Sequence, residues 1–215
     1  MRTKIFNLII LDESGSMVSI KQEAIDNVNE TIQTIRSAQR KHEDQEHFVT
    51  IVTFNDDVKA VCECVSADQV KEFDDQTYQP ECGTALYDAM GHSLNALRRR
   101  VGEGDRVLVT VVTDGRENAS EEYDALAIKA LVDELKEKGW VFAYLGANHD
   151  VEAMASSISI TNVMQFKATP VGTRHMTNVM NRSRGALYCM MSSVDFCSKT
   201  ANENFFENGD DDDEY

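Results

Sequence analysis

The stretch IFNLIILDESGS, residues 5–16, joins an apolar run to a turn rich in oxygen-bearing side chains. The run 5–11 is almost entirely apolar, as expected for a strand of a parallel sheet that is covered on both faces. The alternate spacing of Asp12, Ser14 and Ser16 lets one tight turn aim three side chains to the same side, and Gly15 supplies backbone freedom for that turn. The stretch therefore predicts a buried strand that delivers three oxygen ligands to one point.

Strand-like runs and helical periodicities alternate along the rest of the chain. Further strands are expected at residues 48–54, 58–65, 106–113, 140–145 and 163–166, and helices at 20–40, 86–97, 120–138, after Asp150, and at 171–191. The turn signal Asn55-Asp56-Asp57 favours an antiparallel hairpin at the edge of the sheet. The order predicts an α/β fold, a doubly wound, mostly parallel six-stranded sheet with one antiparallel edge strand and helices on both faces.

Two local signals mark the ends of the helix expected at residues 120–138. Asn118 and Glu121 have the spacing of a capping box at its start. Gly139 is placed to end the helix as a C-cap.

Length and composition restrict the class of protein. The 215 residues predict one domain over residues 1–200, followed by an acidic, disordered tail at 201–215. No segment has the roughly 20 consecutive apolar residues of a membrane span, and the N-terminal residues show no signal-peptide cleavage pattern. The five cysteines have no zinc-type spacing and indicate reduced thiols in a cytoplasmic protein.

The charge balance argues against two kinds of partner. Lys and Arg total 21 against 37 for Asp and Glu, which gives a formal net charge of −16. A polyanion of this kind is not attracted to nucleic acid or to an anionic membrane. The balance agrees with cation binding without demonstrating it.

Two later segments complete the oxygen-rich turn. Thr84 precedes the helix expected at 86–97, and Asp114 follows the central strand. In a doubly wound sheet the first and fourth strands are neighbours where the winding reverses, so Asp12 and Asp114 are expected to meet at the carboxyl edge. Two adjacent carboxylates repel each other unless a cation lies between them, and the hydroxyls of Ser14, Ser16 and Thr84 are hard donors that suit Mg²⁺, Mn²⁺ or Ca²⁺.

The same residues carry a resemblance to a known family. Asp12-x-Ser14-x-Ser16, a distant Thr84 and a distant Asp114 in Thr-Asp-Gly resemble the metal-ion-dependent adhesion site of the von Willebrand factor type A (vWA) family, with its Rossmann-like fold. The resemblance covers residues 4 to 167 and is greatest to stand-alone bacterial members, some of them similar to tellurium-resistance-associated proteins. It implies a non-catalytic binding module, with Ser14, Ser16 and Thr84 on the metal directly, and Asp12 and Asp114 on it directly or through water.

Simpler interpretations exist for each part of the motif. The Asp12–Ser16 turn could be a helix cap, Thr84 an N-cap, and Asp114 part of an ordinary turn. Glu13 and Glu117 are expected to be solvated charges at the rim of the site. Asp88 is expected either to support the metal ligands or to be a favourable first-turn acid.

Three functions follow from such a site. The leading interpretation is a protein-binding module in which Mg²⁺ bridges to an acidic residue of another protein, because no third carboxylate is placed to complete the coordination. The alternative is a Mg²⁺-dependent hydrolase or phosphoryl-transfer enzyme with Asp12 as nucleophile, although neither a phosphate-binding loop nor a Ser-centred elbow is present. A third interpretation is a metal that only holds loops together.

Overall fold

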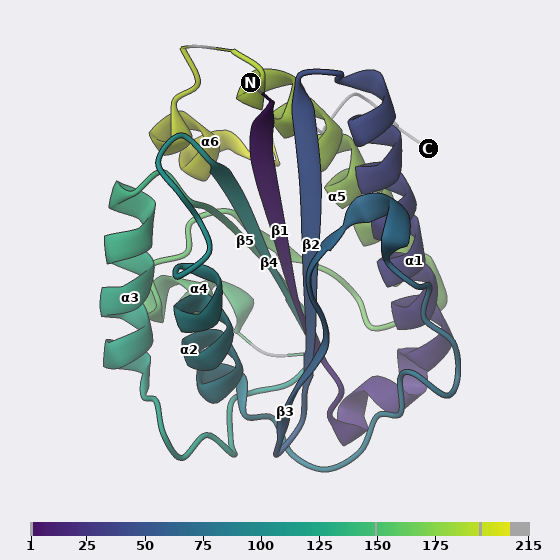
Figure 1. Cartoon of the computed structure of the whole chain (residues 1–215). Helices are drawn as coiled ribbons and strands as arrows, with labels where there is room; N and C mark the ends of the chain where they lie inside the picture. Colours follow the sequence, from purple (N-terminus) through teal and green to yellow (C-terminus); the bar gives the residue numbers. More distant parts are fainter. Residues whose placement is uncertain (1, 149, 194, 207–215) are drawn as a thin grey trace.

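A computed structural model describes residues 2–148, 150–193 and 195–206, and it holds a sheet between two layers of helices (Figure 1). The sheet order is β3-β2-β1-β4-β5-β6. Every neighbouring pair is parallel except β2 and β3, which are antiparallel at the edge. The predicted fold class is confirmed. The strands are β1 (Thr3–Asp12), β2 (Gln45–Phe54), β3 (Val58–Ser66), β4 (Arg106–Thr113), β5 (Val141–Gly146) and β6 (Val163–Gln165).

The helices cover both faces of the sheet. They are α1 (Lys21–Lys41), α2 (Leu86–Leu97), α3 (Ala125–Glu137), α4 (Val151–Ser157), α5 (Pro170–Met191) and α6 (Ser198–Asn204), with two short 3₁₀ turns, η1 (Gly15–Ile20) and η2 (Ala67–Gln69). Helices α1, α5 and α6 pack into one core cluster, and α2, α3 and α4 pack into the other. None of the helices in the described part of the chain is both long and apolar enough to cross a bilayer.

The apolar run of β1 supplies both cores at once. Ile5, Ile9 and Leu11 belong to the cluster with α1 and α5, whereas Leu8 and Ile10 belong to the cluster with α2 and α3. Successive side chains of a strand point to opposite faces, so a strand covered on both sides must be apolar at nearly every position. The run therefore fixes β1 in the centre of the sheet.

The start of α3 differs from the prediction. The helix begins at Ala125, where the side chain of Asp124 accepts the N–H of Ala127 at 2.8 Å. Asn118 and Glu121 do not form the predicted capping box, because the segment before Asp124 is a loop. The C-terminal end is as predicted, with Gly139 at φ +89°.

The predicted boundary of the acidic tail at residue 201 is wrong. The side chain of Asn202, in α6, accepts the N–H of Phe142 at 3.0 Å and donates to the carbonyl of Trp140 at 2.8 Å. Phe205 is buried in the core. Residues 201–206 therefore belong to the folded unit, and the rest of the predicted tail, 207–215, lies outside the described residues.

Candidate metal centre

The carboxyl ends of β1 and β4 bring the two predicted carboxylates to one edge of the sheet. The strands pair in parallel, with Leu11 opposite Val112. Asp12 is the last residue of β1, and its Oδ2 accepts the hydroxyl hydrogen of Thr113, the last residue of β4. Asp114 follows immediately. The neighbouring strands thus join parts of the site that lie about a hundred residues apart.

The loop after β1 is arranged by its own side chains. The N–H of Ser14 donates to Oδ1 of Asp12 at 2.7 Å, and the hydroxyl oxygens of Ser14 and Ser16 lie 3.1 Å apart. Ser14 stands at the cap position of η1, but its side chain makes no capping hydrogen bond. The simple capping interpretation therefore does not account for this serine.

Gly15 lies where two loops meet. Its N–H donates to the carbonyl of Cys82 at 3.1 Å, and a Cβ at this position would lie 3.4 Å from the same carbonyl oxygen. Gly15 is not among the glycines with positive φ. The turn therefore does not use the positive φ that a glycine allows, and Gly15 instead lies in contact with the Cys82 segment.

Thr84 is held by a residue that the sequence analysis assigned to another role. The side-chain oxygen of Asn118 accepts the N–H of Thr84 at 2.9 Å, and the N–H of Asn118 donates to the carbonyl of Thr84 at 3.1 Å. Thr84 is buried, and the cap position of α2 is taken by Ala85, without a side-chain capping bond. Asn118 therefore positions Thr84 instead of capping a helix.

The three loops converge on one small volume. A Cβ built on Gly115 would lie 3.1 Å from Oγ1 of Thr84, 3.4 Å from Oγ of Ser16 and 3.7 Å from Oδ2 of Asp12. Asp114 reaches the same place, because its Oδ1 accepts the hydroxyl hydrogen of Ser16 at 2.5 Å. Together with Ser14 beside Ser16, the structure gathers all five predicted residues, and the glycine leaves the centre open.

The electrostatics of this volume favour a cation. Asp12 is fully buried, and burial is the main reason that its pKa is raised to about 6. Hydrogen bonds from Ser14 and Thr113 oppose this rise in pKa, while the negative charge of Asp114 adds to it. Among the described residues, no Lys or Arg is one of the main groups that set the pKa of Asp12. A divalent ion would supply the missing positive charge.

The donors at this site are all oxygen atoms. Within residues 2–148, 150–193 and 195–206, no group of three or more His, Cys, Asp or Glu side chains is arranged to hold a metal. The site offers two carboxylates and three hydroxyls, all of them hard oxygen donors. Such a set fits Mg²⁺, Mn²⁺ or Ca²⁺ and suits softer metals poorly.

The long loop between η2 and α2 supports the site from outside, and this contact was missed by the sequence analysis. The hydroxyl of Tyr78, a fully buried residue, donates to the carbonyl of Asp12 at 2.5 Å. The carboxylate of Glu13, only 8% exposed, accepts the N–H of Gln79 at 2.5 Å. The prediction that Glu13 is a solvated rim charge is wrong, because this carboxylate holds the loop against the metal-site turn.

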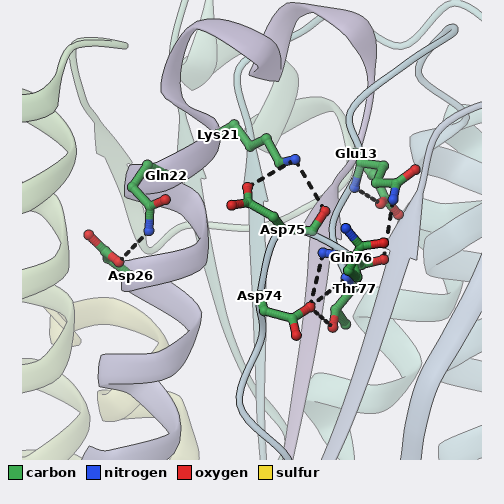
Figure 2. Close-up of polar contacts among 9 residues, drawn as sticks. Glu13, Lys21, Gln22, Asp26, Asp74, Asp75, Gln76 and Thr77 are labelled. Carbon is green, nitrogen blue, oxygen red and sulfur yellow. Dashed lines mark hydrogen bonds and ion pairs between the residues drawn. The ribbon is translucent and has the colours of Figure 1, made fainter.

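Figure 2 shows how the same loop is tied to the start of α1. The carboxylate of Asp74 accepts the N–H groups of Gln76 and Thr77 at 3.0 and 2.8 Å, which closes a turn. Lys21 forms an ion pair with Asp75 at 3.2 Å and also donates to its carbonyl at 3.3 Å. The loop is therefore held at residues 74–77 by its own turn and by Lys21, and at residues 78–79 by its contacts with Asp12 and Glu13.

Two further acids hold backbone, not metal. Glu117 accepts the N–H groups of Tyr87, Ala119 and Ser120 at 2.8–3.0 Å, so it too is more than a solvated rim charge. Asp88 accepts N–H groups from residues 121–123 at 2.8–3.0 Å. Both carboxylates fasten α2 to the loop after β4, and no sequence spacing signals such contacts.

Comparison with known proteins places the chain in a family. The model of the von Willebrand factor type A domain matches residues 8–181. No curated protein sequence matches the chain.

Solved structures share the fold at low identity. A von Willebrand factor type A protein from Catenulispora acidiphila is 14% identical, with a TM-score of 0.57, over 83% of this chain and 42% of its own. The ArnB paralog VWA2 from Sulfolobus acidocaldarius is 14% identical, with a TM-score of 0.57, over 84% and 45%. Proximal thread matrix protein 1 from the mussel byssus, solved with a zinc-occupied MIDAS motif (its metal-ion-dependent adhesion site), is 15% identical, with a TM-score of 0.54, over 82% and 44%.

This chain thus spans less than half of the length of each of these three structures. At such identities the likeness shows the fold alone. The family model, by contrast, matches most of the chain, including the end of β1 with Asp12 and all of β4 with the Asp114 that follows it. The chain belongs to the von Willebrand factor type A domain family.

Proposed function

We propose that Asp12, Ser14, Ser16, Thr84 and Asp114 form a metal-ion-dependent adhesion site, at which Mg²⁺ bridges to an acidic residue of a partner protein. Domains of this family are metal-dependent protein-interaction modules. The observation that carries the proposal is the convergence of oxygens from three loops around the open volume beside Gly115.

The number of donors leaves room for an outside ligand. Mg²⁺ takes six oxygen ligands in near-octahedral geometry. If each of the five side chains binds through one oxygen, at least one coordination position remains for a ligand from outside. Two carboxylates balance the charge of the ion, and the neutral hydroxyls leave it electrophilic. A carboxylate from a partner is the ligand that this arrangement favours.

The rim is open where a partner would approach. Ser16 is exposed, whereas Asp12, Ser14 and Thr84 are buried. Val18, two residues beyond Ser16, is 61% exposed and offers an apolar contact beside the metal. An acidic side chain reaching the ion past Ser16 would also cover this valine.

Magnesium is proposed on the chemistry of the donors, with Mn²⁺ or Ca²⁺ as alternatives. Zinc occupies the corresponding motif in the mussel protein, but hydroxyl and carboxylate oxygens favour harder ions. When bound, the ion would supply a Lewis-acidic centre for an anionic ligand. The cytoplasmic setting and the bacterial, stand-alone type remain predictions from the sequence.

The enzymatic alternative gains no support from the surroundings of Asp12. Besides the metal, phosphoaspartate chemistry usually needs a positioned Lys or Arg and a general acid to manage the developing charge. After burial, the main influences on the pKa of Asp12 are hydrogen bonds from Ser14 and Thr113 and the charge of Asp114. Binding, not catalysis, is the function that we assign to the site.

Isothermal titration with Mg²⁺ tests the metal site. The unmodified protein should bind one ion, and Ser16→Ala should weaken binding at least tenfold. Ser19→Ala is the matched control, because Ser19 lies in the same 3₁₀ turn and, among the described residues, its hydroxyl donates to the carbonyl of Ser16 and not to a proposed ligand side chain. Equal Mg²⁺ affinity in all three proteins would overturn the assignment.

A capture experiment then separates partner binding from a purely structural metal. A partner retained with Mg²⁺ should be released by EDTA and by Ser16→Ala, and kept by Ser19→Ala. A metal that only holds loops together would instead give a large drop in melting temperature on chelation, with no partner whose retention depends on Ser16.

A further inference from the structure

A groove of about 450 Å³ lies between the β2–β3 hairpin and α2, beside the metal centre (elements labelled in Figure 1). This volume is within the range of sites that hold a small ligand or a side chain. Its apolar part is formed by side chains from both walls, namely Val52, Val58, Ala60, Ala96 and Leu97.

The polar part of the groove is strongly acidic. Five carboxylates line it, those of Asp56, Asp57, Glu63, Asp88 and Glu122. Among the described residues that line the groove, Arg100 is the one Lys or Arg, and it pairs with Glu63 at 3.3 Å. Nε2 of His92 lies 3.3 Å from Oε2 of Glu122.

Among the described residues, the other four carboxylates form no ion pair with a Lys or Arg. Asp88 accepts hydrogen bonds from backbone N–H groups only, and Asp56 accepts the N–H of Gly83 at 2.8 Å. Such bonds orient a carboxylate without neutralising it. After the Arg100–Glu63 pair is set aside, the groove therefore holds an excess of negative charge above an apolar floor.

The acidic end of the groove adjoins the metal centre. Asp56 is bonded to Gly83, the residue directly before Thr84. Asp88 lies in the first turn of α2, one helical turn beyond Thr84. A polypeptide that places one side chain on the metal can therefore place a neighbouring side chain in the groove.

We infer that the groove binds the side chain of a lysine from the same partner protein. An alkylammonium side chain has an apolar stem that would lie on the valine and alanine floor, and a compact cation that would reach the carboxylates. The statement that this lysine belongs to the protein bound at the metal rests on the proposed function. The preference for an alkylammonium group follows from the groove itself.

The first test is an NMR titration in EDTA with Nα-acetyl-lysine-N-methylamide as the probe. It should shift the amide signals of Val58 and Ala96 saturably, and the norleucine analogue, which lacks the ammonium group, should bind at least tenfold more weakly. The double variant Asp57→Asn/Glu122→Gln should lose at least tenfold in affinity. The double variant Glu30→Gln/Glu137→Gln, which removes two exposed charges on α1 and α3 away from the groove, controls for net charge and should bind as the unmodified protein does.

Several results would overturn the inference. Equal binding of the lysine and norleucine probes would remove the role of the cation, and absence of binding would remove the site. If the free diamine 1,5-diaminopentane bound tenfold more tightly than the lysine probe, the groove would be a site for a small polyamine instead of a partner's lysine.

The half-buried thiol of Cys64, which lines the groove, gives an independent readout. With the other four cysteines replaced, 2-aminoethyl methanethiosulfonate should label Cys64 at least tenfold faster than the anionic 2-sulfonatoethyl reagent, after each rate is normalised to that of 2-mercaptoethanol. Asp57→Asn/Glu122→Gln should bring the ratio towards one. A ratio near one in the parent protein, or a thiol unreactive to both reagents, would contradict the inference.

Failure of this inference and failure of the metal site are distinguishable. Both groove experiments are carried out without metal, and the Mg²⁺ titration of Ser16→Ala needs no lysine probe. If the lysine probe and the thiol reagents show no preference for a cation, the proposal of a metal site is unaffected. If Mg²⁺ does not bind at Ser16, the groove can still bind an alkylammonium group, but the proposal that a metal-bridged partner carries this group is overturned.

Discussion

Oγ of Ser16 lies 2.5 Å from Oδ1 of Asp114, although 98 residues separate the two along the chain. The hydroxyl donates its hydrogen to the carboxylate, so the oxygen lone pairs of the serine remain available to a cation. The contact links the loop after β1 to the loop after β4. The proposed metal centre therefore depends on the packing of the sheet, and changes that move either loop are expected to alter metal binding.

Replacing Asp12 with Asn should stabilise the metal-free protein while abolishing metal binding. The pKa of Asp12 is raised from 3.8 to about 6 by burial, so at pH 7 the folded protein holds an ionised group that the fold disfavours. Removing that charge should add up to about 3 kcal/mol to the free energy of unfolding. Urea denaturation in EDTA at pH 7 measures this gain.

The gain from Asp12→Asn should shrink as the pH falls from 6 to 4, because the carboxyl group of the unmodified protein is then protonated in the folded state. Added Mg²⁺ should raise the melting temperature of the unmodified protein and not that of Asp12→Asn. A variant less stable than its parent in EDTA at pH 7 would contradict this account.

Gly115→Ala should block the site with little effect on the fold. The new methyl group would lie 3.1 Å from Oγ1 of Thr84 and 3.4 Å from Oγ of Ser16, in the volume proposed for the metal. Affinity for Mg²⁺ should drop at least tenfold in isothermal titration. Gly185→Ala in α5 is the control, since no atom lies within 4 Å of its added Cβ. It should bind Mg²⁺ normally and be more stable by about 0.5–1 kcal/mol.

Asn118→Ala should weaken metal binding although Asn118 is not a proposed ligand. Its side chain holds the N–H of Thr84 at 2.9 Å, and supports of this kind typically change metal affinity 10- to 100-fold. Asn95→Ala is a matched control, because Asn95 bonds Gly91 and Tyr123 away from the metal. The assignment of Asn118 fails if the two variants have the same affinity for Mg²⁺.

His47 should make the protein acid-sensitive. Burial, with smaller effects of His42 and Arg184, lowers the pKa of His47 from 6.5 to about 4. Between these values the unfolded chain binds a proton that the folded protein does not, so stability falls as the pH falls from 6.5 to 4, by an amount on the order of 3 kcal/mol.

Asp12 titrates in the opposite sense over nearly the same range, so the test of His47 belongs in the Asp12→Asn background. There, His47→Gln should remove most of the loss of stability between pH 6.5 and pH 4 in urea denaturation. If the two proteins lose stability equally over this range, His47 is not the group responsible.

The sequence by itself was sufficient for the architecture, because strands buried on both faces must be apolar at nearly every position. The run 5–11 and the run 106–113 carry this signal most strongly, and both are central strands in the structure. The convergence of the five proposed site residues could also be predicted, since Asp12 ends one central strand, Ser14 and Ser16 follow it, and Asp114 follows the other. Thr84 was placed by its position before a helix.

Only the tertiary structure decided how those residues are held. The side chains of Tyr78, Glu13 and Asn118 hold the site through hydrogen bonds to backbone groups far away in the sequence. No sequence motif marks such a contact, because any residue can supply a backbone N–H or carbonyl group. Local rules assigned Asn118 to a helix cap and Glu13 to solvent, because they consider neighbours along the chain and not across loops. The apolar pattern of a strand is a local requirement of burial, whereas the partner of a buried polar group is chosen by whichever backbone the folded chain brings to it.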